Sequence, residues 1–174
     1  MSIFYKEDAM QHVQTRSTTS ALVLTAVLIA LATLFTMYTK IPVPGIRGYF
    51  NVGDVVIMTS ALLLGRKYGA YIGAIGPALA DLFLGYAVFV PITFVVKGIE
   101  GYLVGTVYNH KTTTSALVAT IVGGIIIVAG YFIAEYFVFD PGVAIASILT
   151  NTIQAVMSVI ISMILYAILR KRLG

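Results

Sequence analysis

Polar and ionisable side chains lie inside long apolar stretches of this sequence. Flanked by runs of Leu, Ile, Val, Ala, Gly and Phe, they are Asp81, Lys97, Glu100, Glu135, Asn151 and Gln154. A charged group in hydrocarbon costs about 3 kcal/mol or more unless it faces a partner or a polar cavity. The pattern therefore predicts a membrane protein with a binding pocket.

Two pairs of side chains are spaced to share a helix face. Asn151 and Gln154 are three residues apart, and their amides can donate and accept hydrogen bonds, either to a ligand or between helices. Tyr131 and Glu135 are four apart, so an aromatic ring lies beside a carboxylate. That combination suits a flat, nitrogen-bearing ligand, although Glu135 could instead lie in a simple anchor at the membrane interface.

Asp81 and Lys97 carry opposite charges on neighbouring apolar stretches. We expect them at similar depth on adjacent antiparallel helices, where a buried ion pair would fix the packing of those helices. Glu100 is one turn from Lys97 and adds a second carboxylate. The alternative is that Asp81 and Lys97 contact a ligand directly.

The segment between the first two apolar stretches, residues 40–51, contains two prolines and two glycines, which interrupt a helix. We expect it to form an extracellular lid loop, because loops on a rigid scaffold commonly carry binding. Asn51 and Asp54 open the next stretch, and either could cap that helix. With Tyr49, they would also lie at the mouth of the predicted pocket.

The composition predicts an all-α integral membrane protein with a single membrane domain, residues 1–174. Of its 174 residues, 59% are hydrophobic and 10% are charged, against roughly 25% charged in soluble domains. A transmembrane helix needs about 20 apolar residues, so the sequence predicts a bundle of six spans. They cover about residues 19–38, 52–65, 68–86, 91–108, 115–137 and 143–169. We expect the polar segment 1–18 to be cytoplasmic.

The distribution of Lys and Arg predicts cytoplasmic N- and C-termini, because cytoplasmic loops are enriched in both residues. One side of the predicted bundle carries Lys6, Arg16, Arg66, Lys67, Lys111, Arg170, Lys171 and Arg172, and the other carries Lys40 and Arg47. In this orientation the embedded polar residues share the outer half of the membrane. The net charge of +4 is scattered, which argues against a nucleic-acid partner. Without cysteine or a metal motif, we expect no metal or other cofactor.

The sequence resembles the S components of energy-coupling factor (ECF) transporters, the small membrane subunits that capture a vitamin. The matching features are Ala26 and Ala30 in the first span, Ile41-Pro42-Val43-Pro44, Gly48-Tyr49, Gly53-Asp54, Ala61-Leu62-Leu63-Leu64-Gly65, Gly73-Ala74-Ile75-Gly76, Ala80-Asp81-Leu82, Gly85-Tyr86, Pro91-Ile92-Thr93 and Lys97-Gly98. The resemblance covers essentially the whole chain, densely in the first four spans and loosely in the last two.

This resemblance implies a six-helix bundle in the bacterial cytoplasmic membrane, with a high-affinity site near its outer face. It also implies that Ala26 and Ala30 dock onto a transmembrane coupling subunit, which is itself bound to two ATPase subunits. The chain has no Gly-rich loop ending in Gly-Lys-Ser or Gly-Lys-Thr, so ATP would be used by the partners. No enzymatic activity is expected.

Within the family, the Gly-Tyr-x-Asn-x-Gly-Asp pattern at residues 48–54 most resembles members for pyridoxine-type or hydroxymethylpyrimidine-type substrates. Riboflavin and pantothenate are the alternatives. Another alternative is a self-sufficient secondary transporter or channel, although such folds usually show an internal repeat, and none is visible. The candidate substrate-binding residues are Tyr49, Asn51, Asp54, Asp81, Tyr86, Lys97, Tyr131, Glu135, Asn151 and Gln154.

Overall fold

The computed structural model describes residues 18–42, 49–109 and 112–173 and shows an all-α protein, as predicted. Its described elements are α2 (Thr18–Tyr38), β1 (Ile41–Pro42), β2 (Tyr49–Phe50), α3 (Asp54–Leu64), α4 (Arg66–Phe83), α5 (Phe89–Val107), α6 (Thr113–Val138) and α7 (Pro141–Leu173). Each helix matches one predicted apolar stretch, with most boundaries within a few residues. The predicted cytoplasmic segment 1–18 lies almost wholly outside the described residues.

Local sequence signals explain where several helices begin. The Thr112 side chain accepts a hydrogen bond from the Ser115 backbone N–H at 3.0 Å and caps α6. Asp140 accepts one from the Val143 N–H at 3.0 Å and leads into α7, with Pro141 at the first helical position, where a missing N–H costs little. Gly65 has φ of 89°, which favours glycine, and lets α4 follow α3 directly.

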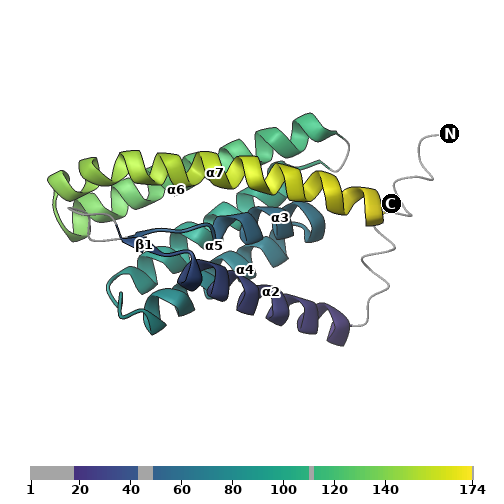
Figure 1. Cartoon of the computed structure of the whole chain (residues 1–174), viewed down its shortest axis with the longest axis horizontal. Helices are drawn as coiled ribbons and strands as arrows, with labels where there is room; N and C mark the ends of the chain where they lie inside the picture. The colour runs from purple at the N-terminus through teal and green to yellow at the C-terminus, as the bar shows by residue number, and fades with distance from the viewer. Residues whose placement is uncertain (1–17, 43–48, 110–111, 174) are drawn as a thin grey trace.

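The short helix α3 forms the centre of the bundle (Figure 1). Nine of its eleven residues are buried, and it packs against α2, α4, α5 and α7. Helices α6 and α7 lie side by side, whereas α2 packs on α4 and α3. The start of α2 and the end of α7 lie at the same end of the bundle (Figure 1). The opposite end is therefore built from the ends of α2, α4 and α6 and the starts of α3, α5 and α7.

Helices α4 and α5 touch through their backbones at glycines. A Cβ atom on Gly69 would overlap the Gly101 carbonyl, and one on Gly101 would overlap the Gly69 carbonyl. A Cβ atom on Gly73 would overlap the carbonyl of Lys97. Gly69 and Gly73 are four residues apart on one face of α4, a spacing of small residues that lets two helix backbones approach closely. This close contact also fixes the backbone that carries Lys97.

Four described helices, α2, α5, α6 and α7, are long and apolar enough to cross a membrane. Helix α3 has eleven residues and is about 17 Å long at 1.5 Å per residue, roughly half of a 30 Å hydrocarbon core. Helix α4 has eighteen residues but includes Arg66, Lys67 and Asp81. The predicted number of six full spans and the predicted orientation stay predictions.

Candidate functional site

A polar cavity lies at the end of the bundle opposite the described chain ends. Seven of the predicted site residues line it, namely Asn51, Asp81, Lys97, Tyr131, Glu135, Asn151 and Gln154. The volume of the cavity is about 40 Å³. Side chains from α4, α5, α6 and α7 therefore meet at one place, although they are far apart in the sequence.

Asp54, at the start of the central helix α3, organises the floor of this cavity. Its side chain is fully buried, and its two oxygens accept hydrogen bonds from Lys97 Nζ and from Gln154 Nε2, the latter at 2.7 Å. Gln154 Oε1 in turn accepts a hydrogen bond from the Asn51 backbone N–H at 3.1 Å. The amide of Gln154 is thus used to join α7 to α3 and to the end of the loop.

The prediction that Lys97 pairs with Asp81 is wrong. Lys97 does form a buried ion pair, but with a different carboxylate. Lys97 pairs with Asp54 and lies 3.8 Å from Glu100 Oε2. The reason is that α3 occupies the centre of the bundle, so the Lys97 side chain reaches inward to α3. Asp81 lines the same cavity from α4.

The predicted capping of α3 by Asn51 or Asp54 is also wrong. The residue before the helix is Gly53, and no side chain caps its first turn. Asn51 Oδ1 instead accepts a hydrogen bond from the Gly53 N–H at 2.9 Å, and Asp54 is occupied by Lys97 and Gln154. Asp54 is turned into the bundle, which gives this carboxylate stronger, charged partners than a backbone cap would.

Glu135 lines the cavity from α6. It is only 3% exposed and accepts a hydrogen bond from the Ser147 hydroxyl, which also receives one from Asn151 Nδ2 at 3.5 Å. The interpretation of Glu135 as an interfacial anchor is therefore wrong, whereas its neighbour Tyr136 is 45% exposed. This chain of groups links the end of α6 to the start of α7.

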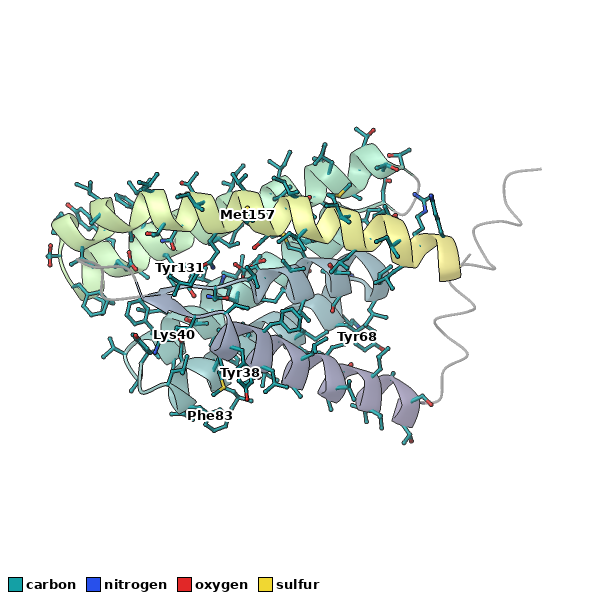
Figure 2. All side chains as sticks on the ribbon, viewed as in Figure 1. Tyr38, Lys40, Tyr68, Phe83, Tyr131 and Met157 are labelled. Carbon is teal, nitrogen blue, oxygen red and sulfur yellow. The ribbon has the colours of Figure 1, made fainter. Side chains whose placement is uncertain are left out.

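Tyr131 lies on α6, one turn from Glu135 (Figure 2). Its hydroxyl and that of Thr93 are hydrogen-bonded at 2.9 Å, and its ring centre lies 5.4 Å from Lys97 Nζ. The aromatic ring and the carboxylate therefore share one face of α6, as the four-residue spacing predicts.

Three candidate residues are not part of the described lining of the cavity: Asp54, whose carboxylate holds Lys97 and Gln154, and Tyr86 and Tyr49. Tyr86 packs edge-on against Phe89 at 6.3 Å, and Lys40 Nζ lies 4.8 Å from the Tyr86 ring centre. Tyr49 pairs through its backbone with Pro42, and its side chain lies outside the described residues. Residues 43–48 of the predicted lid are also outside them, so the lid stays a prediction.

The sequence did not single out six residues that line the cavity: Thr36, Pro77, Phe89, Thr93, Ser147 and Thr150. Spacing could have found two of them, because Thr93 and Ser147 lie four residues before Lys97 and Asn151. Hydroxyls are less informative, since they often bond to their own helix backbone. Thr36 is different, because its hydroxyl is buried without a hydrogen-bond partner among the described residues.

The lining offers carboxylates, amides, hydroxyls and the rings of Phe89 and Tyr131. Within the described residues, no group of three or more His, Cys, Asp or Glu side chains could hold a metal ion. The arrangement suits recognition of a small polar ring by hydrogen bonds and stacking.

Residues 16–171 match a family model described as the ECF-type riboflavin transporter, S component. The chain belongs to this S-component family. It is thus a subunit of a transport system and a multi-pass protein of the cytoplasmic membrane, and the family is not an enzyme family. S components work with an ECF module and bind a vitamin, so the alternative of a self-sufficient transporter or channel loses its support.

Similar proteins agree with this assignment. An uncharacterised protein of Pyrococcus woesei is 41% identical over 145 residues, covering 82% of this chain and 96% of that protein. The thiamine precursor transporter HmpT of Lactococcus lactis is 29% identical over 149 residues, covering 84% and 83%. A solved S component of a bacterial ECF transporter has the same fold, with a TM-score of 0.71 and 20% identity over 91% of this chain and 99% of that one.

Proposed function

We propose that this S component captures a single-ring vitamin precursor of the hydroxymethylpyrimidine type. The substrate would enter from the outside and be passed to an ATP-driven module. The observation that carries the proposal is the small, polar cavity between α2 and α4–α7. The similarity to a thiamine precursor transporter supports the same substrate class.

The cavity volume favours a small substrate. At about 40 Å³, it is far below the roughly 300–1,000 Å³ of sites for drug-sized ligands. Any vitamin must therefore displace lining side chains as it enters. Tyr131 and Asn151 are only half-buried, whereas Asp54 and Gln154 are held by the floor network. A single pyrimidine ring requires much less displacement than the three fused rings and sugar-like chain of riboflavin.

The polar groups also fit an aminopyrimidine. Such a ring carries an amino donor next to a ring-nitrogen acceptor. Glu135 presents an acceptor, and the Asn151 amide, joined to it through Ser147, has a second N–H that can donate. The rings of Phe89 and Tyr131 are available for stacking. Pyridoxine shares the single ring, whereas the carboxylate of pantothenate would meet Glu135 with the same charge.

Riboflavin is the second candidate, because the matching family model names it. The size of the cavity weighs against it. Isothermal titration calorimetry of the detergent-purified protein with hydroxymethylpyrimidine, pyridoxine, riboflavin and pantothenate decides between them. We expect the pyrimidine to bind most tightly. Tight binding of riboflavin without measurable binding of the pyrimidine would overturn the proposal.

The partner subunits would supply the energy for transport, and they would dock onto the exposed face of α2. Ala26 and Ala30 are both exposed there, so the internal packing of the bundle does not use them. Neighbouring side chains on this face are apolar, with Val23 and Val27 each 57% exposed. The small alanines would let a helix of the transmembrane coupling subunit approach closely, and its two ATPase subunits would use the ATP.

Substitution of Ala26 and Ala30 by Trp tests this docking surface. We expect uptake by cells that contain the whole module to be abolished, while ligand binding to the purified S component is unchanged. Ile164→Trp, at an exposed position on α7, is the control and should reduce uptake less. Loss of binding in the double variant would mean that the two alanines serve the fold instead.

A further inference from the structure

Glu135 is a buried carboxylate at the cavity whose charge the fold does not balance. Its one hydrogen bond among the described contacts comes from the neutral Ser147 hydroxyl, and no described cation lies within ion-pair distance. An ionised carboxylate buried away from water requires a counter-charge or several hydrogen bonds. The cavity side of Glu135 is where such a group could approach.

The described charged groups around the cavity are mostly acidic. The charged residues that line it are Asp81 from α4, Lys97 from α5 and Glu135 from α6, and α2 and α7 contribute none. Two further carboxylates, Asp54 of α3 and Glu100 of α5, lie next to Lys97. The single ammonium group of this set, that of Lys97, lies against Asp54 and 3.8 Å from Glu100. It is therefore already shared by two carboxylates on the floor.

Thr36 provides an independent sign of an incomplete site. It lines the cavity and is 1% exposed, and its hydroxyl lacks a hydrogen-bond partner among the described residues. Buried polar groups are normally satisfied. A polar ligand in the cavity could satisfy this hydroxyl as well as Glu135, because both residues line the same cavity.

We infer that the cavity takes its ligand as a cation, with a protonated or permanently charged nitrogen set against the Glu135 carboxylate. The inference rests on the proposed function for the pyrimidine ring and adds a rule for its charge. A positive group supplies the counter-charge that Glu135 lacks, whereas an anionic group would add to an excess of carboxylates. Substrates with a carboxylate or phosphate are thereby rejected.

A matched ligand series tests the rule. The 4-amino-2-methylpyrimidine ring is used with three groups at carbon 5: hydroxymethyl, which is uncharged, aminomethyl, which is cationic, and carboxylate, which is anionic. Calorimetry on the detergent-purified chain should show the aminomethyl compound binding at least as tightly as the hydroxymethyl one. The carboxylate compound should bind at least tenfold more weakly than either.

A charge-removing variant assigns the preference to Glu135. Glu135→Gln keeps the shape, and we expect it to shrink the gap between the aminomethyl and carboxylate compounds at least tenfold. Asp140→Asn is the matched control, because Asp140 is exposed, lies outside the cavity and caps α7, a role that Asn also performs. The control should keep the full gap.

The outcomes separate the charge rule from the proposed substrate. Equal binding of the three compounds would overturn the charge rule and leave the pyrimidine assignment standing. Binding of the aminomethyl compound alone would support the charge rule and contradict hydroxymethylpyrimidine as the substrate. Binding of uncharged riboflavin, with no binding of the series, would overturn both.

Discussion

Two helix pairs in this S component are packed in different ways. In α4–α5, glycines bring the backbones into contact, so that a single added methyl group at Gly69 or Gly101 would overlap a carbonyl group. In α6–α7, the nearest glycine contact is looser, with a Cβ at Gly124 falling 3.3 Å from the Ala155 Cβ. This second pair also leaves an apolar groove of about 560 Å³ on its outer side.

The two helix pairs form different parts of the cavity. The tightly packed pair fixes Lys97, which together with Asp54 makes the floor. The looser pair supplies Tyr131, Glu135 and Asn151, which line the walls of the cavity. A cavity of about 40 Å³ must enlarge to admit a vitamin, and we expect α6 and α7 to provide that movement because their packing depends on side chains that can shift.

Substitutions in the floor of the cavity should lower the stability of the protein most. Lys97→Met would leave Asp54 and Glu100 buried without their cation, and loss of one partner of a buried ion pair typically costs about 3–5 kcal/mol. We expect a large fall in the thermal unfolding midpoint of the detergent-purified protein. Adding Asp54→Asn should restore part of it by removing one uncompensated charge. An unchanged midpoint in Lys97→Met would contradict the role of the floor.

A pair of alanine substitutions tests the contrast in helix packing directly. Gly101→Ala places a methyl group against the Gly69 carbonyl, and we expect a loss of about 3 kcal/mol, the upper part of the range for overpacking. Gly124→Ala places a methyl group 3.3 Å from that of Ala155 and 3.7 Å from a Val159 methyl group, with no backbone carbonyl among the nearest atoms, so we expect a loss below about 1 kcal/mol. Thermal unfolding measures both. Equal losses would remove the distinction between the two helix pairs.

The sequence predicted the helices well, because apolar runs and breaks at Pro, Gly and charged residues determine where a membrane helix can form. It also placed Asp81, Lys97, Glu135 and Asn151 at one depth, which follows from counting residues along each run. These predictions depend only on local sequence and on the length of a helix.

The errors concern the central helix. The helices that carry Asp81 and Lys97 are neighbours, as the sequence predicts, but Lys97 pairs with Asp54 because α3 also packs against α5. The shortness of α3 was the available signal, since an eleven-residue helix cannot span the bilayer and is easily enclosed by longer ones. Similarly, nothing in the sequence distinguishes Thr36 from the threonines that bond to their own helices.

Substitutions in the walls of the cavity should affect ligand binding more than protein stability. Asn151→Ala removes an amide from the half-buried wall of the cavity, and we expect the affinity for the pyrimidine to fall at least tenfold, about 1.4 kcal/mol. Glu135→Ala should have at least as large an effect. Thr152→Ala is the control, because Thr152 is exposed on α7 and lines the outer groove instead. Unchanged affinity in both wall variants would remove the site assignment.

The smallest effect is expected where the two helix pairs meet. Tyr131→Phe keeps the aromatic ring and removes only the hydroxyl bonded to Thr93, so we expect a loss of stability of about 1 kcal/mol. If α6 moves relative to α5 to admit the ligand, this hydrogen bond stabilises the closed state, and the variant should bind the pyrimidine no more weakly than the original protein.

Calorimetry of Tyr131→Phe and of Tyr131→Leu separates the contribution of the hydroxyl to binding from that of the ring, since loss of the ring should weaken binding through lost stacking. Weaker binding in Tyr131→Phe of the same size as in Tyr131→Leu would show that the hydroxyl contacts the ligand, and that the wall is not the movable part of the site.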